Sequence, residues 1–524
     1  MGSNNVRQHF FKGAMLLTIA GMIGKVLSAG YRIPLQNIAG DVGFYIYQQV
    51  YPFLGMAWMI SIYGFPVAIS TLVAERRMLS MRGFFVPVFL LLISISLVLC
   101  GLLYGGAPFI ATFMGDEGLV MPLRVSALVF LFLPFTSILR GTFQGLQDMG
   151  PTAYSQITEQ LVRVVVIVLA TVYLVGGGYS LYHVGAGAAF GSIVGAMVAI
   201  GVLGAFAVKR LPSSINEQRP IPFRNIIRTV FMVGLFICLN YMLLLFIQLG
   251  DALTMVAQLK DYGYSLEKAK EWKGVFDRGY PLIQLGTVIG SSFALSLVPS
   301  LTKQRLENKR AEAYADAHSA IKFSFIFSAA AAVGLVLVLP EVNVLFFNSR
   351  HGTETLQVLA VLVLFGSLAL TYSSLLQGLG RMKTPAVMVL LGFVVKVFLN
   401  IWLIPMYGIT GGAISSVTAI MVVWGGNALL LYRTIRVPFI NSLPWKAITM
   451  SLLALISTVL AGKWVMETLF TIQTRLDYLW YTISIVSAGI FVTMLVLLRM
   501  NVFTEDELYA LPFGGKLIWL WKRR

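Results

Sequence analysis

Residues 84–107 read FFVPVFLLLISISLVLCGLLYGGA, an apolar run without a single charged side chain. The hydrocarbon core of a bilayer is about 30 Å thick, so a helix that crosses it needs roughly 20 apolar residues. Similar windows recur along the whole chain, and they predict an all-α polytopic membrane protein with fourteen transmembrane helices. The predicted spans are 13–37, 43–72, 84–107, 121–145, 153–175, 184–207, 225–250, 275–299, 317–340, 355–378, 385–405, 409–432, 445–466 and 478–498.

The composition favours the same class. The 524 residues are 58% hydrophobic and 12% charged, whereas soluble domains carry about a quarter charged residues. The 39 Lys and Arg against 22 Asp and Glu give a net charge of +17. This charge is scattered between apolar runs, whereas a nucleic-acid-binding face requires it to be clustered. Membrane lipids, and not nucleic acid, are therefore the predicted partners.

Cysteine, histidine and loop motifs indicate neither a cofactor nor an enzyme. Cys100 and Cys238 lie far apart in apolar stretches, and the four histidines form no HExxH or paired pattern. The longest predicted outer loop, about 251–273, shows no catalytic motif. We therefore expect no metal site and no catalytic residue. The first span is long, carries Lys25 and lacks a cleavage site, so it is predicted to remain as a helix.

The distribution of Lys and Arg predicts the orientation of the helices. With the N-terminus inside, the inner segments hold 24 basic residues and the outer segments hold seven. Because short cytoplasmic loops are enriched in Lys and Arg, both termini are predicted to be cytoplasmic. We expect a multi-pass protein of the cell membrane, acting as a monomer.

A repeat appears when the chain is compared with itself at an offset of about 230 residues. Tyr51-Pro52 then matches Tyr280-Pro281, and Arg163 falls opposite Lys396. Six helices return the chain to the same side, so helices one to six and seven to twelve are predicted to form two parallel repeats, or lobes. The predicted domains are the N-lobe 1–207, a cytoplasmic linker 208–224, the C-lobe 225–438, helices thirteen and fourteen at 439–500, and a cytoplasmic basic tail 501–524.

Eight basic residues fall within the predicted spans. Charge at the bilayer centre costs at least about 2.5–3.5 kcal/mol per residue, so an intramembrane ion is a functional hypothesis by default. Lys25, Arg163 and Lys396 lie near the middle of their helices, where they need a partner or water. Three others lie nearer to helix ends and can extend to the headgroups: Arg124, Arg140 and Lys322.

Lys25 and Arg32 are seven residues apart and share a face of helix one, about 10 Å apart along its axis. No acid of that helix can neutralise them. Together with Arg278, which opens helix eight, they predict a cationic cavity that accepts an anionic head group. The alternative is that Lys25 pairs with an acid of another helix and Arg278 pairs with Asp277.

Helix five carries Glu159, Gln160 and Arg163. Glu159 and Arg163 are spaced i, i+4 and can form an ion pair on one face, which lowers the cost of burying both. With Arg140 and Lys396, these residues are candidates for a structural ion pair or for a role in transport coupling. Lys396 has a glycine four residues before it, so it is predicted to be less well compensated than Arg163.

Several motifs resemble those of the polysaccharide-biosynthesis flippases, a group of the multidrug/oligosaccharidyl-lipid/polysaccharide exporter superfamily that includes the stage V sporulation protein B and lipid II flippase branches. The resemblance extends over essentially the whole chain. It is carried by Arg140–Gly145 (RGTFQG), Met149, Pro151–Ala153, Ser155-Gln156, Glu159-Gln160, Arg163, Gly64–Ser70 (GFPVAIS), Val73–Glu75 and Leu297–Leu301 (LVPSL).

The resemblance implies a flippase that moves a polyprenyl-diphosphate-linked saccharide, of the cell-envelope or peptidoglycan precursor class, by alternating access. It implies that Lys25, Arg32 and Arg278 bind the substrate, and that helices thirteen and fourteen form a groove for its lipid tail. A multidrug or cation antiporter of the same superfamily is the alternative. Such an antiporter needs acids in its cavity, and the acids at membrane depth are predicted to be Glu159 and Asp277.

Overall fold

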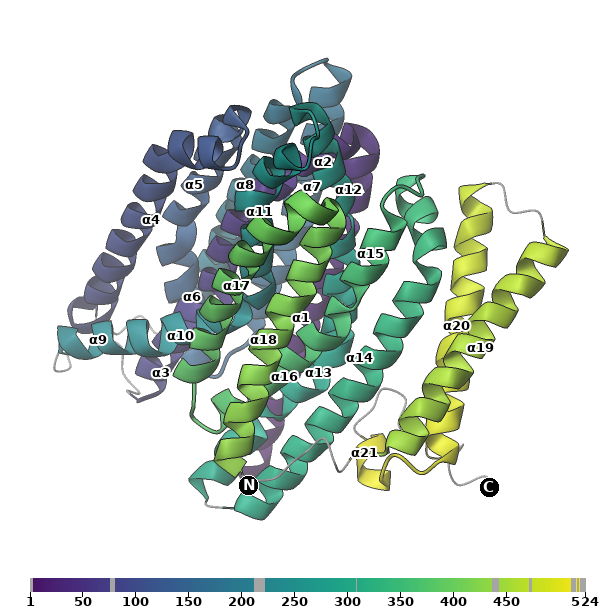
Figure 1. The fold of residues 1–524 in the computed structure, drawn as a ribbon. Helices are drawn as coiled ribbons and strands as arrows, with labels where there is room; N and C mark the ends of the chain where they lie inside the picture. The colour runs from purple at the N-terminus through teal and green to yellow at the C-terminus, as the bar shows by residue number, and fades with distance from the viewer. Residues whose placement is uncertain are drawn as a thin grey trace. The chain divides into compact units, whose positions relative to one another are not determined.

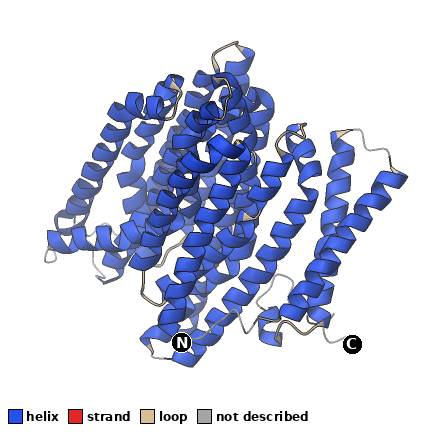
Figure 2. Cartoon of the chain, viewed as in Figure 1, coloured by secondary structure: helices blue, strands red, loops and turns tan. Residues whose placement is uncertain are grey.

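The computed structural model describes residues 3–75, 81–211, 222–307, 309–435, 443–470, 474–509, 515 and 518. All regular secondary structure in this part of the chain is helical (Figure 2), which confirms the predicted class. Thirteen helical stretches within it are long and apolar enough to cross a membrane, as expected of a multi-pass membrane protein. The count of fourteen stays a prediction, since one stretch, Ile19–Ala74, has 56 residues and covers two predicted spans.

The chain divides into two compact units, with boundaries inside helix α13 (Gly279–Leu306), between helices α16 (Leu362–Gly378) and α17 (Lys383–Tyr407), and inside helix α18 (Ile409–Ile435). Unit 1 comprises Met1–Pro281 and Met382–Ser415, and unit 2 comprises Leu282–Arg381 and Ser416–Arg524. These units are not the predicted lobes, so the division by sequence repeat stays a prediction. Parts of the predicted linker, of the connection before helix thirteen and of the tail lie outside the described residues, namely 212–221, 436–442, 510–514, 516–517 and 519–524.

Unit 1 contains the first twelve helices and α17 (Figure 1). Helix α7 packs against α1 and α8, and α11 packs against α17. Close packing of α8 depends on its small residues, because a Cβ on Gly195 would lie 2.8 Å from the backbone oxygen of Glu159. The helices are α1 (Ser3–Gly30), α2 (Arg32–Met59), α3 (Phe65–Glu75), α4 (Val86–Phe113), α5 (Val120–Leu128), α6 (Leu133–Gly145), α7 (Gly150–Gly176), α8 (Leu181–Arg210), α9 (Phe223–Thr229), α10 (Phe236–Tyr241), α11 (Leu243–Asp261), α12 (Leu266–Asp277) and α17 (Lys383–Tyr407).

Unit 2 contains most of α13 and α18 and six further helices. Helix α14 packs against α16, α19 and α20, and Leu368, Tyr372 and Leu431 belong to its buried apolar core. The helices are α13 (Gly279–Leu306), α14 (Arg310–Phe347), α15 (Thr353–Ala360), α16 (Leu362–Gly378), α18 (Ile409–Ile435), α19 (Trp445–Leu469), α20 (Arg475–Arg499) and α21 (Glu505–Tyr509).

A sharp bend at Gly40 shapes the start of unit 1. The helix continues from α1 into α2, because Tyr31 has helical dihedral angles and its N–H donates to the oxygen of Leu27 at 3.2 Å. It is interrupted at Gly40, whose φ of 71° is left-handed and therefore favours glycine. Lys25 and Arg32 consequently lie on one helical arm, as predicted, and residues after Gly40 form a second arm.

The predicted span 225–250 is wrong in position. Helix α11 begins at Leu243 and ends at Asp261, while α9 and α10 run across the long helices of unit 1 (Figure 1). Hydropathy predicted one helix over 225–250 because this whole stretch is apolar. Its first half, however, belongs to α9 and α10. Asp251, expected in an outer loop, instead lies buried in α11.

Candidate functional site

Arg32 is a cation buried in unit 1, and no carboxylate of the described residues pairs with it. Its side chain is 0% exposed, and none of its three guanidinium nitrogens makes a hydrogen bond to the described residues. Its guanidinium carbon lies 4.0 Å from the centre of the Tyr51 ring, whose face offsets part of the buried charge. The fork of N–H donors matches the oxygens of a phosphate, so these donors are uncommitted and suited to an anion.

Three tyrosines accompany this guanidinium. The hydroxyls of Tyr31 and Tyr47 are hydrogen-bonded to each other, and the ring centres of Tyr47 and Tyr51 are 6.0 Å apart. Tyr47 and Tyr51 are four residues apart on α2, which places both on one side of that helix. Phenolic hydroxyls can also donate to an oxyanion. We call Arg32, Tyr31, Tyr47 and Tyr51 the Arg32 cluster.

Lys25 lies on the same helical arm, seven residues before Arg32, and is half-buried. No carboxylate of the described residues pairs with its ammonium group. The predicted alternative, an acid from another helix, is therefore not formed here. The arm contacts α7 next to Lys25, because a Cβ on Gly24 would lie 3.5 Å from the Cγ of Gln160.

Arg278, the third predicted binding residue, is neutralised by Asp41. Its terminal nitrogen lies 2.6 Å from Oδ2 of Asp41, and its Nε lies 3.0 Å from Oδ1. Asp277 pairs instead with Lys273 at 2.5 Å, since the two residues are spaced i, i+4 on α12. The expected pairing of Arg278 with Asp277 is therefore wrong. Within the part of the chain that the structure describes, Lys25 and Arg32 have no carboxylate partner, whereas Arg278 has Asp41.

Helix α12 meets the bend after Gly40 at very close range. A Cβ on Gly274 would lie 2.1 Å from the backbone oxygen of Asp41, so glycine is required at this approach. Lys270, one turn earlier, donates to the hydroxyl of Tyr182 at 2.9 Å, and Tyr182 donates to Asp116 at 2.7 Å. Burial lowers the pKa of Lys270, but its bonds to Tyr182 and Glu267 and the charge of Asp116 raise it overall.

The Glu159–Arg163 pair is formed, and it is part of a triad. Glu159 Oε1 accepts from Arg163 at 2.8 Å, and its Oε2 accepts from Arg140 at 2.7 Å. Arg140 is 0% exposed and also donates to the oxygen of Ser61 at 3.2 Å. Extension of Arg140 to the headgroups is therefore wrong. With its amide turned to suit its neighbours, Gln160 accepts from Arg163 at 3.1 Å.

Lys396 has a partner that sequence spacing did not suggest. Its Nζ lies 2.6 Å from Oδ1 of Asp251 on α11, and both side chains are 0% exposed. It also donates to Asn400 at 2.9 Å and to Ser415 at 2.8 Å. The remaining carboxylate oxygen of Asp251 accepts from the hydroxyl of Tyr280. The prediction that Lys396 is poorly compensated is therefore wrong.

Lys322 is likewise better bound than expected. Its Nζ donates to Glu507 of α21 at 2.7 Å and to the backbone oxygen of Val502 at 3.1 Å. It therefore does not extend to lipid headgroups. Arg124 is exposed, with its guanidinium 5.2 Å from the ring centre of Tyr104.

The residues that sequence reasoning missed are Asp41, Asp251 and the tyrosines of the Arg32 cluster. Asp41 follows the bend at Gly40, and an Asp after glycine gave no signal for a partner 237 residues away. The i, i+4 spacing of Tyr47 and Tyr51 was a usable signal. Apolar residues continue beyond Asp251, and this pattern could have predicted that Asp251 lies inside a helix.

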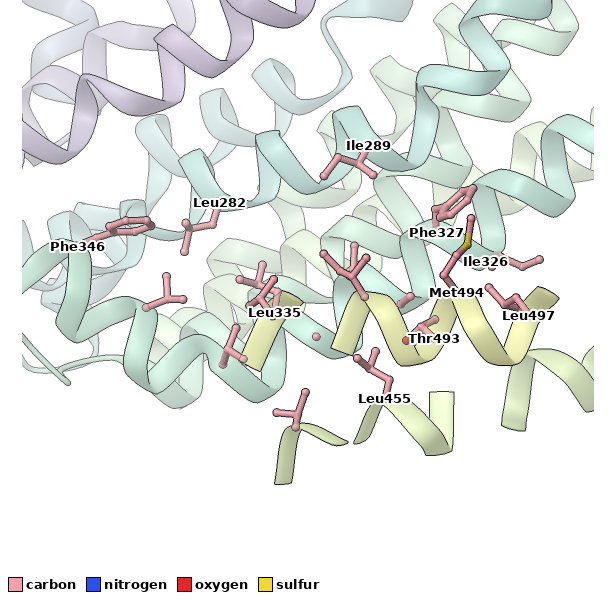
Figure 3. A pocket seen from close by; sticks show the side chains of 18 residues that line it. Leu282, Ile289, Ile326, Phe327, Leu335, Phe346, Leu455, Thr493, Met494 and Leu497 are labelled. Atoms are coloured by element: carbon pink, nitrogen blue, oxygen red, sulfur yellow. The ribbon is translucent and has the colours of Figure 1, made fainter. Parts of the chain in front are cut away.

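Unit 2 contains an apolar groove of about 540 Å³ between α13, α14, α19 and α20. Figure 3 shows Phe346 towards one end and Leu497 towards the other, with Thr493 contributing a lone oxygen among the labelled side chains. Such a surface suits hydrocarbon chains. Its elements include α19 and α20, which correspond to the predicted helices thirteen and fourteen.

Comparison with known proteins places the chain in a family. Residues 10–305 match the family described as polysaccharide biosynthesis protein. The chain is 40% identical to the Bacillus subtilis "Uncharacterized membrane protein YabM", covering 100% of this chain and 98% of the relative. It is 25% identical to "Lipid II flippase MurJ" of Bacillus subtilis, covering 81% and 82%.

A solved structure, titled "Lipid II flippase MurJ, inward closed conformation", shares the fold. Its TM-score is 0.66 at 14% identity, with 92% of this chain and 98% of that chain covered. The fold and the sequence comparisons agree with the resemblance described above. The chain therefore belongs to the polysaccharide biosynthesis protein family.

Proposed function

We propose that the chain is a flippase that moves a polyprenyl-diphosphate-linked saccharide across the cell membrane by alternating access. The saccharide is of the cell-envelope or peptidoglycan precursor class, and both termini face the cytoplasm. The observation that carries the proposal is the Arg32 cluster, in which a buried guanidinium has no counter-ion among the described residues. In a flippase, the diphosphate of the substrate supplies the missing negative charge.

Energy favours an anion at this position. Placing an arginine at membrane depth costs at least about 2.5–3.5 kcal/mol on insertion scales, unless a partner or water compensates it. Arg32 is 0% exposed and lacks a hydrogen-bonding partner among the described residues. Lys25 on the same arm adds a second uncompensated charge, which suits the two phosphates of a diphosphate. Arg278 would join them only after releasing Asp41.

Access to Arg32 requires movement. The side chain is buried in this conformation, so substrate reaches it only when the surrounding helices open. Alternating access provides such an opening on each side in turn. The relative named a lipid II flippase supports the lipid-linked saccharide class.

The arrangement of carboxylates argues against the cation antiporter. An antiporter that carries cations needs a carboxylate able to receive them. The acids of the site are all bound to Lys or Arg: Asp41 to Arg278, Glu159 to Arg140 and Arg163, Asp251 to Lys396, and Asp277 to Lys273. The uncompensated charges, Lys25 and Arg32, are positive, so the site suits an anion.

Binding of a polyprenyl diphosphate to the purified protein in nanodiscs tests the proposal. Arg32→Gln should weaken binding by about tenfold or more, because a charge-assisted hydrogen bond contributes about 1.5–3 kcal/mol. Lys25→Gln should weaken it as well, and the double variant should abolish transport while the protein still inserts. Polyprenol, which lacks the diphosphate, should bind wild type and variants equally.

Arg124→Gln is the matched control, because Arg124 is an exposed arginine of α5 outside the Arg32 cluster. It should retain wild-type affinity. Unchanged diphosphate affinity in Arg32→Gln, or full complementation of a deletion strain by the double variant, would refute the anion site. Drug resistance that depends on Glu159 would instead support the antiporter.

A further inference from the structure

A polar cavity of about 550 Å³ lies in unit 2 beside the connection between α19 and α20. Its charged lining residues are Glu341 of α14, Arg350 after α14 and Glu467 of α19. Tyr478 and Tyr481 of α20 complete its polar wall. None of these residues belongs to the Arg32 cluster, and the proposed flippase chemistry does not use them.

The polar cavity and the apolar groove lie on the same helices. On α14, Glu341 of the cavity is adjacent to Val342 of the groove. On α19, Val459 lines the groove, and Glu467 lines the cavity two turns later. Tyr481 of the cavity packs in one apolar cluster with Val342 and Val459 of the groove. The lining thus changes from apolar to polar along α19 and α20, while on α14 Glu341 lies between the groove residues Val338 and Val342. Adjoining apolar and polar parts are the pattern of a site for an amphiphile.

The carboxylates of the cavity have unused acceptor capacity. Glu341 pairs with Lys463 through Oε1 at 2.7 Å, but its buried Oε2 has no hydrogen-bond donor among the described residues. Glu467 pairs with no Lys or Arg of the described chain and accepts weakly from Tyr481 at 3.4 Å. A buried acceptor without a donor is costly, and a group bearing N–H would satisfy it.

The same cavity offers a guanidinium. Arg350 is exposed, and its bond to the hydroxyl of Tyr478 is long, at 3.4 Å. Together with Lys463, it balances the two carboxylates, so this set of four charged groups is neutral overall. A neutral set with separate acidic and basic parts complements a zwitterion better than a net anion.

We propose that the cavity binds the head group of a phospholipid with a primary amine, whose acyl chains occupy the adjoining groove. The ammonium donates to Glu341 Oε2 and Glu467, and the phosphate accepts from Arg350. A choline head group carries no N–H and leaves Oε2 of Glu341 unsatisfied. The site therefore selects phosphatidylethanolamine over phosphatidylcholine and over anionic phosphatidylglycerol.

Thermal unfolding of the delipidated protein in micelles tests this selection. Phosphatidylethanolamine should raise the midpoint more than phosphatidylcholine or phosphatidylglycerol with identical acyl chains. Glu467→Gln, at an exposed position that should fold, and Glu341→Gln should both remove the difference between the ethanolamine and choline lipids. Arg350→Gln should weaken stabilisation by all three phospholipids.

Glu354→Gln is the matched control, because Glu354 is an exposed acid of α15 outside the cavity. It should keep the wild-type lipid preference. Equal stabilisation of wild type by the three lipids would overturn the proposal, as would an ethanolamine preference that survives Glu467→Gln. Loss of polyprenyl diphosphate binding in Glu467→Gln would also overturn it, by assigning the cavity to the substrate. Arg32→Gln should not alter the lipid preference, so the two proposals fail separately.

Discussion

Arg163 and Lys396 occupy matching positions in the sequence repeat, and the structure buries them in different ways. Arg163 shares Glu159 with Arg140, and Glu159 lies four residues before it on the same helix. Lys396 on α17 is paired with Asp251 on α11. Loss of Arg163 leaves a balanced pair behind, whereas loss of Lys396 leaves a buried carboxylate alone. The comparison predicts that two buried charges at matching positions of the predicted repeat are unequally replaceable.

Lys396→Met is the substitution with the largest expected effect. It leaves Asp251 uncompensated, and breaking a buried pair in this way costs about 3–5 kcal/mol. Denaturant unfolding of the purified protein in micelles measures the loss. The double variant Lys396→Met with Asp251→Asn should recover most of it, because neither charge remains. A double variant as unstable as the single one would show that the two residues are not coupled.

Gly250→Ala tests whether the Lys396 pair depends on space in α11. A Cβ on Gly250 would lie 2.7 Å from Cγ of Lys396, so the lysine stem must move. Overpacking of this kind costs about 1–3 kcal/mol. Gly250→Ala should lower the unfolding midpoint when it is introduced into the wild-type protein. It should lower the midpoint much less in the Lys396→Met, Asp251→Asn double variant, because no ammonium group then fixes the side chain at position 396. An equal fall in both backgrounds would place the clash elsewhere.

Arg163→Met should destabilise the protein much less than Lys396→Met. We expect about 1 kcal/mol, within the range of ordinary substitutions, because Glu159 keeps its bond to Arg140 at 2.7 Å. The same unfolding assay compares the two variants directly. If Arg163→Met costs as much as Lys396→Met, then Arg140 does not compensate Glu159 and the contrast between the two sites is lost.

The Lys322–Glu507 pair extends the comparison to the edge of unit 2, and its effect should be the smallest. Burial raises the pKa of Glu507, but bonds from Lys322, the Thr504 backbone and Ser319 lower it below its ordinary 4.5 overall. The pair's contribution is therefore complete above about pH 4.5 and lost as the pH falls further.

Unfolding midpoints of wild type and Glu507→Gln, measured between pH 6 and pH 3, test whether the pKa of Glu507 is lowered. Their difference should be constant at the upper end and disappear towards the lower end. A difference that grows on acidification would mean that the pKa of Glu507 is raised, not lowered.

The sequence was a good guide wherever the controlling interaction is local. Apolar run length predicted the helical membrane class, and the i, i+4 rule predicted the Glu159–Arg163 pair. The same rule could have predicted the Lys273–Asp277 pair, which left Arg278 for Asp41. Spacing along one helix carries these contacts, because residues four apart meet on the same face.

Contacts between distant segments were beyond the same reasoning. Asp251 lies 145 positions before Lys396 in the chain, and hydropathy alone placed it in a loop. The start of α11 depends on the interruption at Met242, which has no strong breaker residue. Arg32 was predicted as a binding residue, but its stack on Tyr51 depends on the return of the chain after Gly40.

The bend at Gly40 has a consequence for how tightly an anion can be held. Arg32 and Tyr51 stand on opposite arms of that bend, so the dihedral angles of Gly40 contribute to the distance between guanidinium and ring. Spreading the arms would move the Tyr51 ring away from the Arg32 guanidinium, which would then be stabilised more strongly by a bound anion. Folding them together restores the ring as a substitute partner.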